Sequence, residues 1–175
     1  MQYLNRDETR RLLDQVHITR DRALLMTMLY RGLRASEPRL LRRRDIDLQA
    51  NTITIQRLKG SNGGRYALTP QEVFSLTAWL EDPKCNQHPE GRIFPISGRQ
   101  VYNVFQKYAK AAGLPEDKQH PHVLKHTIAT LLLDQGYTPA DVQDWIGHKS
   151  ITSTMIYAQV TSERRRANAA RFQPL

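Results

Sequence analysis

The sequence predicts a mainly α-helical domain with one small antiparallel β-sheet or hairpin, an α+β architecture over residues 1–175. Three observations support this prediction. Most of the chain places apolar residues at helical spacing between residues that begin or end helices. Only residues 52–68 alternate apolar and polar side chains as a strand does. A length of 175 residues suffices for one domain with a real core and is short for two.

The first thirty residues are expected to form two helices. Asn5 and Glu8 have the spacing of a capping box, which predicts an amphipathic helix through about residue 17. Thr19 is expected to cap a second helix that is apolar almost all round. Such a helix belongs in the core, and Gly32 is expected to end it.

The next segment is expected to form a short helix and then the sheet. Pro38 suits the first turn of a helix. Three consecutive arginines would lie on its outer face: Arg42, Arg43 and Arg44. Residues 52–57 and 65–68 have the strand pattern and flank a glycine-rich turn, which predicts a β-hairpin with Lys59 near its tip.

The rest of the chain is expected to be helical apart from two loops. The expected helices span about residues 70–80, 98–112, 122–135, 139–146 and 151–157. Thr69, Thr138 and Ser150 precede three of them as capping residues. Residues 82–92 and 114–119 read as loops.

Charge and composition narrow the class of function. The net charge of +9 arises from 26 Lys and Arg against 17 Asp and Glu, which favours a polyanionic partner such as nucleic acid. One cysteine, Cys85, excludes an internal disulfide and a Cys-based zinc site. No apolar run has the length of a membrane span and no signal peptide begins the chain, so we expect a cytoplasmic, nucleoid-associated protein without a membrane partner.

Several residues could together transfer a phosphodiester without a metal ion. Such a reaction needs a nucleophile, cations that neutralise the phosphate oxygens, and an acid for the leaving oxygen. His122 and Lys125 share the first turn of a predicted helix, His148 follows a glycine, and Tyr157 lies nine residues later. A tyrosine is a suitable nucleophile because its aryloxide can leave again, which makes the covalent step reversible.

These residues belong to a longer series of motifs. In chain order the series is Gly32-Leu33-Arg34-Ala35-Ser36-Glu37, Lys59, His122-x-x-Lys125-His126, Leu131-Leu132-x-x-x-Gly136, Gly147-His148 and Tyr157. The series resembles the catalytic domain of tyrosine recombinases, the phage integrase family, over nearly the whole chain and in the family's order. The fold expected from the resemblance is a helical bundle with a small antiparallel sheet.

The resemblance implies a role for each matching residue. Arg34 would clamp the scissile phosphate, and His148 would hydrogen-bond to it. Tyr157 would form a 3′-phosphotyrosyl link, and Lys59 would protonate the departing 5′ oxygen. His122 would assist proton transfer.

The resemblance also implies the supporting parts of the site and its partners. Glu37 would brace the site without taking part in the chemistry. The family needs no metal, cofactor or ATP, acts on double-stranded DNA, and works as four protomers on two DNA sites, so a tetramer is expected on DNA. DNA contacts are expected from five basic residues: Arg42, Arg43, Arg44, Arg57 and Arg65.

Two features depart from the family's pattern. Lys125 stands where the family has the arginine of His-x-x-Arg, so a second guanidinium fork is missing and slow catalysis is expected. The family's N-terminal DNA-clamping domain is also absent from the pattern. The chain is therefore expected to be either an excised catalytic domain or a recombinase of the short fimbrial-invertase type.

Two alternatives remain open at the level of sequence. His122 and His126 have the i,i+4 spacing of a two-histidine metal site, with His120 nearby, although no carboxylate or thiol is in register with them. The helices on either side of Gly136 also resemble a helix-turn-helix, which would suit a catalytically attenuated or inactive DNA-binding regulator. A regulator has no use for Arg34, Lys59 and Tyr157 together.

Overall fold

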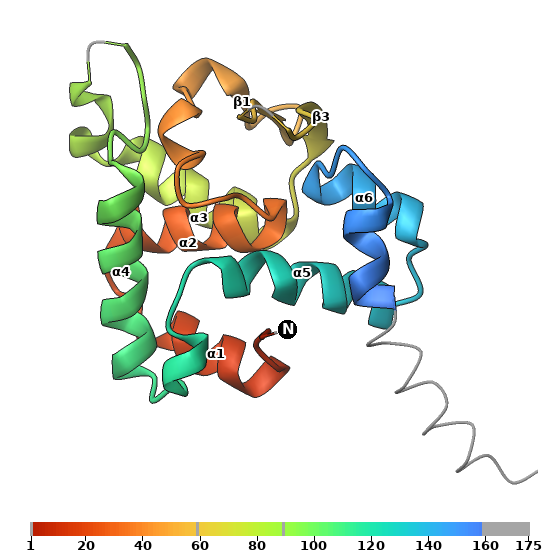
Figure 1. Ribbon diagram of the computed structural model, residues 1–175. Coiled ribbons are helices and arrows are strands. Elements are labelled where there is room, and N and C mark those ends of the chain that lie inside the picture. The colour runs from red at the N-terminus through yellow and green to blue at the C-terminus, as the bar shows by residue number, and fades with distance from the viewer. Residues whose placement is uncertain (1, 59, 89, 159–175) are drawn as a thin grey trace, which may run out of the picture.

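The computed structural model describes residues 2–58, 60–88 and 90–158 (Figure 1). The described chain is mostly helical with one three-stranded antiparallel sheet, which confirms the predicted fold class. Helices α2 (Thr19–Arg31) and α5 (His122–Asp134) pack against each other across the centre of the molecule. The other α-helices are α1 (Arg6–Asp14), α3 (Pro70–Glu81), α4 (Gly98–Ala111) and α6 (Pro139–Ile146), and residues 152–158 are also helical.

Short-range capping fixes where most helices begin. Asn5 and Glu8 form the expected capping box at α1, and Thr69 and Thr138 accept hydrogen bonds from backbone amides in the first turns of α3 and α6. The prediction for Thr19 was wrong, because Thr19 is the first helical residue and Ile18 precedes it without a side-chain cap. Packing of α2 against α3 and α5 stabilises its start instead.

The short helix expected after Pro38 is replaced by two 3₁₀ turns, η1 (Pro38–Leu40) and η2 (Arg43–Asp45). The chain is extended between them because it pairs with a segment far along the sequence. The amide of Ile93 donates to the carbonyl of Leu41 at 3.2 Å, and that of Arg43 donates to the carbonyl of Gly91 at 2.9 Å. The expected loops likewise contain the 3₁₀ turns η3 (Pro83–Gln87) and η4 (Glu116–Lys118).

The predicted hairpin is confirmed and has one additional strand. The order is β1 (Ile46–Asp47), β2 (Thr52–Ile55), β3 (Gly64–Ala67), and both pairings are antiparallel. Ile53 and Ile55 are buried, so one face of the sheet covers the core while the other carries polar residues. The hairpin thereby holds the segment that follows β2 beside the end of α6. The amide of Asn62 in this segment donates to the carbonyl of Gly147 at 3.0 Å.

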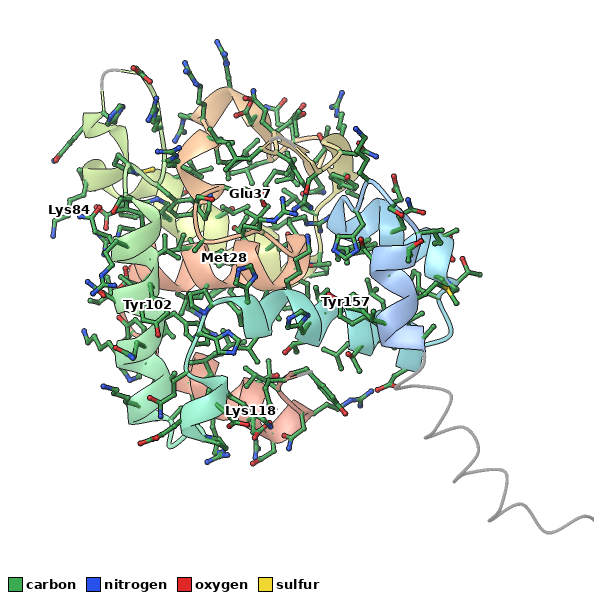
Figure 2. All side chains as sticks on the ribbon, viewed as in Figure 1. Met28, Glu37, Lys84, Tyr102, Lys118 and Tyr157 are labelled. Atoms are coloured by element: carbon green, nitrogen blue, oxygen red, sulfur yellow. The ribbon has the colours of Figure 1, made fainter. Side chains whose placement is uncertain are left out.

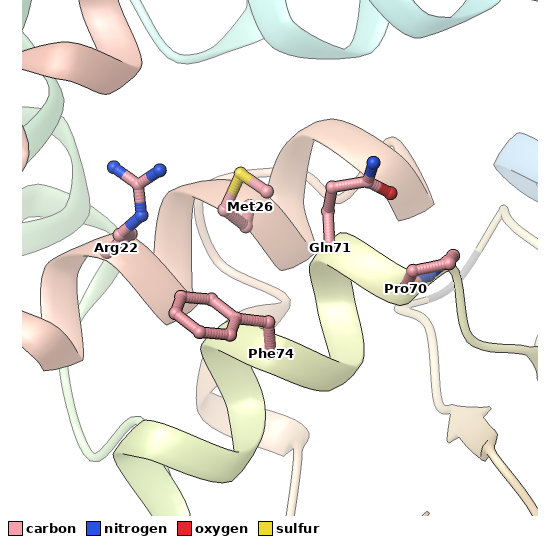
Figure 3. A pocket seen from close by; sticks show the side chains of 5 residues that line it. All are labelled: Arg22, Met26, Pro70, Gln71 and Phe74. Atoms are coloured by element: carbon pink, nitrogen blue, oxygen red, sulfur yellow. The ribbon is translucent and has the colours of Figure 1, made fainter.

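A small cavity of about 220 Å³ opens between α2 and α3 (Figure 3). Its lining residues are Arg22, Met26, Pro70, Gln71 and Phe74. Within the described part of the chain, none of the residues expected from the sequence to be functional lines it. Among the described residues, no helix combines the length and the apolar character needed to cross a membrane.

A fully buried ion pair joins α2 to α3. Neither Arg31 nor Glu72 has any exposed side-chain surface, and Arg31 Nε donates to Glu72 Oε1 at 2.6 Å while Nη2 donates to Oε2. Nη2 also donates to the carbonyl of Ala67 in β3 at 3.0 Å, and the guanidinium lies 5.1 Å from the ring centroid of Trp145 in α6. One side chain therefore links two helices, the sheet and α6.

Removing one partner of this pair is expected to be costly. Arg31→Ala leaves the Glu72 carboxylate buried without its counter-ion, which should lower the free energy of unfolding by about 3–5 kcal/mol. Urea denaturation of the purified protein measures this. Arg10→Ala is the matched control, because the pair between Arg10 and Asp7 is largely exposed and should contribute little to stability. Equal midpoints for the two variants would contradict the prediction.

Candidate active site

The turn after α2 places Arg34 at the centre of the candidate site. Gly32 ends α2 with a φ of +56°, a conformation that favours glycine. A β-carbon at Gly32 would collide with the side chain of Ile146 and would also touch the side chain of Lys125. Glycine at this position therefore allows the end of α2, with Arg34 two residues later, to approach α5 and α6 closely.

Glu37 braces this turn from inside the protein, near the centre of the view in Figure 2. Its carboxylate is buried, with Oε2 accepting hydrogen bonds from the Arg34 amide at 2.8 Å and from Arg57 Nη1 at 3.3 Å. Oε1 lies 3.5 Å from Arg34 Nη1. The carboxylate thus holds both the backbone and the guanidinium of Arg34.

Arg57 differs from the sequence-based expectation of a DNA contact. Its side chain has no exposed surface. Besides the bond to Glu37, its guanidinium donates to the carbonyl of Arg31 at 2.6 Å and to that of Gly32 at 3.2 Å. Burial lowers the pKa of Arg57 from its ordinary value, and the nearby Glu37 charge opposes this shift. Arg57 therefore donates to the carbonyls at the end of α2 and does not face solvent, so the predicted DNA contact at this residue was wrong.

The other basic residues expected to contact DNA lie at the surface. Arg65 keeps 63% of its side-chain surface exposed and bonds to Thr52 Oγ1. Arg43 and Arg44 are exposed, and Arg42 is partly buried with its guanidinium 3.6 Å from Glu90. These four positions remain available to an approaching polyanion.

Lys59, the expected general acid, lies outside the described residues. The described residues just after it are tied to the site. Ser61 Oγ accepts a hydrogen bond from Arg34 Nη1 at 2.5 Å, and Ser61 forms an antiparallel bridge with His148. Sequence reasoning did not single out Ser61, because its partner is 27 residues away along the chain.

Lys125 on α5 is almost completely buried, with 4% of its surface exposed. Its ammonium donates to the carbonyl of Ile146 at 3.0 Å. Burial lowers the pKa of Lys125 to about 7, and the guanidinium groups of Arg57 and Arg34 act in the same direction. The ammonium of Lys125 therefore feels the charges of the Arg34 and Arg57 guanidinium groups, and it loses its proton more readily than an exposed lysine does.

The two expected histidines share this positive environment. His148 Nδ1 lies 3.0 Å from Thr154 Oγ1, and burial followed by the charges of Lys125 and Arg34 lowers its pKa to about 4. His122 begins α5 with more of its surface exposed, and partial desolvation of its ring and the nearby His120 also lower its pKa. His148 is accordingly neutral at pH 7.

Tyr157 completes the group from the last described helix (Figure 2). Only 1% of its surface is exposed, and burial raises its pKa to about 12. Its hydroxyl lies 2.9 Å from His126 Nδ1, and its ring stacks on His148 with centroids 6.1 Å apart. The structure therefore brings Arg34, Lys125, His148 and Tyr157 into one chain of contacts and charge interactions.

Comparison with known proteins shows the family of the chain. The family model described as "Phage integrase family" matches residues 2–164. The chain belongs to the phage integrase family. The mostly helical fold and the expected class of function, a site-specific tyrosine recombinase, are thereby confirmed.

Individual relatives of this phage integrase family domain support the same assignment. It is 33% identical over 163 residues to the type 1 fimbriae regulatory protein FimB of Escherichia coli, covering 89% of this chain and 78% of that protein. It is 30% identical over 171 residues to the tyrosine recombinase XerA of Thermococcus kodakarensis, covering 93% of this chain but only 60% of that protein. A crystal structure of XerA recombinase superposes with a TM-score of 0.84 at 26% identity, covering 99% of this chain and 64% of that chain.

Among the residues that the structure describes, no group of three or more His, Cys, Asp or Glu side chains is arranged to hold a metal ion. His126, which the i,i+4 spacing had related to His122, directs Nδ1 to the Tyr157 hydroxyl. The sequence showed the spacing but not the partner, because Tyr157 is 31 residues away.

Two arginines of the hairpin region should respond differently to truncation. Arg57→Ala leaves buried carbonyls and part of the Glu37 charge without a partner, so the free energy of unfolding should fall by about 3 kcal/mol or more. Arg65→Ala removes an exposed side chain and should change it by less than about 0.5 kcal/mol. Denaturant titration of both variants checks the prediction, and a tolerant Arg57→Ala variant would contradict the buried role.

Proposed function

We propose that this domain cleaves and rejoins double-stranded DNA with the Tyr157 hydroxyl as nucleophile. The observation that supports this most is the position of Tyr157 at the edge of a cationic cluster. Its ring stacks on His148, whose pKa is lowered first by burial and further by the charges of Lys125 and Arg34. A nucleophile and the groups that would hold a phosphate are thus adjacent.

The electrostatics of the cluster favour an anionic substrate. Lys125, His148 and His122 all have lowered pKa values, and neighbouring positive charges contribute to each shift. A phosphodiester would relieve this repulsion and raise the three pKa values. Arg34 has 34% of its side chain exposed, so its planar fork is accessible to two phosphate oxygens.

The proposed step balances as a transfer between two oxygens. The Tyr157 oxygen forms a bond to phosphorus while the bond from phosphorus to the 5′ oxygen breaks, which leaves a 3′-phosphotyrosyl link. Arg34 and Lys125 neutralise the negative charge that develops on the non-bridging oxygens, and His148 donates a hydrogen bond to one of them. Lys59 supplies a proton to the 5′ oxygen, and His122 assists removal of the phenolic proton. Attack of a 5′ hydroxyl reverses these events and rejoins DNA.

The proposal requires neither a metal ion nor ATP. Cationic side chains occupy the role that Mg²⁺ has in many other phosphoryl-transfer enzymes. The phosphotyrosyl bond conserves the energy of the phosphodiester, so that rejoining needs no further energy source.

We propose that the reaction takes place in an assembly of several protomers on DNA. Four protomers act on two DNA sites, and association with DNA keeps the protein at the nucleoid. The surface arginines Arg42, Arg43, Arg44 and Arg65 contact the DNA backbone beside the site. Each neutralised phosphate should contribute about −0.9 to the slope of log affinity against log salt concentration.

The nucleophile can be tested with a nicked suicide substrate, which traps the covalent intermediate because the cleaved fragment diffuses away. The wild-type chain should form an adduct that survives a denaturing gel, with or without EDTA. Tyr157→Phe removes only the hydroxyl, so the adduct should disappear while DNA affinity stays the same.

Other outcomes of this experiment would point elsewhere. An adduct that persists in Tyr157→Phe would refute the choice of nucleophile, and an adduct lost on chelation would refute metal independence. DNA binding by the wild-type chain without any adduct would favour the DNA-binding regulator.

Lys125 is expected to make cleavage slow and DNA binding dependent on pH. One ammonium cannot donate two parallel hydrogen bonds to two phosphate oxygens, and loss of a well-placed donor costs about 10²–10³ in rate in a comparable site. The free-protein pKa of about 7 should rise when a phosphate binds. Because the protonated form binds the phosphate better, affinity should fall as pH rises from 6 to 9.

Lys125→Arg tests both expectations in one variant. It should raise the single-turnover cleavage rate about tenfold or more and flatten the pH dependence of DNA affinity, because arginine stays protonated throughout this range. Arg65→Ala is the control, since it should lower affinity equally at every pH without changing the slope. A slower Lys125→Arg enzyme would show that the pocket accommodates only lysine.

A further inference from the structure

The contact between His126 and Tyr157 has no role in the steps described above. His126 lies on α5 immediately after Lys125 and is partly buried. Its Nδ1 is 2.9 Å from the Tyr157 hydroxyl, and the two ring centroids are 5.6 Å apart with the ring planes at 49°. His148 stacks on the same phenol at 22°. The Tyr157 ring is therefore in contact with two imidazoles, only one of which reaches its reactive oxygen.

Burial and the charges around His126 keep its ring neutral. Burial lowers the pKa of His126 to about 4, and the charges of His122, His120 and Lys125 act in the same direction. A positive charge on His126 would in turn lower the pKa of His148. A neutral imidazole has one ring nitrogen with a free lone pair. With Nε2 protonated, Nδ1 accepts the phenolic hydrogen.

We propose that His126 is a positioning residue for the nucleophile, which fixes the direction of the Tyr157 oxygen by accepting its hydrogen bond. This inference rests on the proposed role of Tyr157. The phenolic hydrogen turns about the C–O bond, so the acceptor that takes this hydrogen also sets the direction of the lone pairs on the oxygen. Acceptance by Nδ1 engages the hydrogen of the hydroxyl, and the attack on the phosphorus of a DNA phosphodiester uses a lone pair of the same oxygen.

The role is one of orientation and not of proton removal in the DNA-free protein. His126, with a pKa of about 4, is a weak base beside a phenol whose pKa is about 12. The phenol therefore keeps its proton and remains bonded to His126 until a substrate phosphate and the cations of the site change both groups. A fixed starting geometry matters because small misplacements of reacting atoms reduce rates by about 10²-fold.

Two substitutions separate positioning from packing. His126→Leu fills a similar volume without an acceptor, whereas His126→Asn places an amide oxygen close to the position of Nδ1. On the nicked substrate, His126→Leu should cleave about 10²-fold more slowly at unchanged DNA affinity. His126→Asn should recover most of that loss, to within about tenfold of the wild-type rate. His17→Leu, at an exposed position in the turn after α1, is the matched control and should cleave normally.

Two kinetic outcomes would overturn the proposal. Wild-type cleavage by His126→Leu would show that no acceptor is needed. Equal rates for His126→Asn and His126→Leu, with thermal unfolding showing both folded, would reduce His126 to a packing residue.

Nitrogen-15 NMR of the histidine rings tests the contact without any cleavage. In the DNA-free protein near pH 7, His126 should show a protonated Nε2 and an unprotonated Nδ1, and Tyr157→Phe should shift the Nδ1 resonance. An Nδ1 resonance that does not respond to Tyr157→Phe would overturn the inference. A wild-type chain that forms no adduct would instead overturn the proposed function, and the NMR result distinguishes that failure from absence of the contact.

Discussion

A single buried carboxylate, that of Glu37, allows two guanidinium groups to lie side by side in the interior of the site. Arg34 and Arg57 would repel each other there, and Arg57 has no solvent to screen its charge. With Glu37 between them, Arg57 can donate to the carbonyls of Arg31 and Gly32 at the end of α2, and Arg34 can extend toward solvent. The hairpin, the end of α2 and the position of Arg34 therefore depend on one acid, whose removal would leave two positive charges uncompensated.

The sequence predicted those parts of the fold that depend on neighbours in the chain. Capping at Asn5, Thr69 and Thr138 involves residues three positions apart, so the helix starts could be located from local pattern alone. The pairing of Leu41 with Ile93 could not be predicted in this way, because no local pattern indicates a partner about fifty residues away. This pairing makes the chain extended where a helix was expected. Arg57 was misplaced for the same reason, since alternation within a strand cannot show that its end lies against α2 and α6.

The same distinction applies to the site. Motif order was enough to select His148 and Tyr157, but their contacts depend on how three helices meet. His126 shares a helix face with His122 at i,i+4, which locally suggested a common ligand. The last described helix instead directs Tyr157 onto His126, and Thr154 of that helix bonds to His148. The contacts in the candidate site therefore join residues that no single motif contains. The spacing within each motif identified candidate residues, and the structure shows which of them are in contact.

Lys125 reduces the repulsion among the positive charges of Arg34, Arg57 and its own side chain in the protein without DNA. An arginine in this buried position would keep its full charge beside the guanidinium groups of Arg34 and Arg57. The carboxylate of Glu37 would oppose that repulsion. Burial lowers the pKa of Lys125 to about 7, so this side chain can release its proton near neutral pH and avoid part of that repulsion. Its bond to the Ile146 carbonyl needs only one donor, which the neutral amine still has. We therefore propose that lysine takes the place of a second guanidinium fork as a group that becomes charged when a phosphate is present to stabilise it.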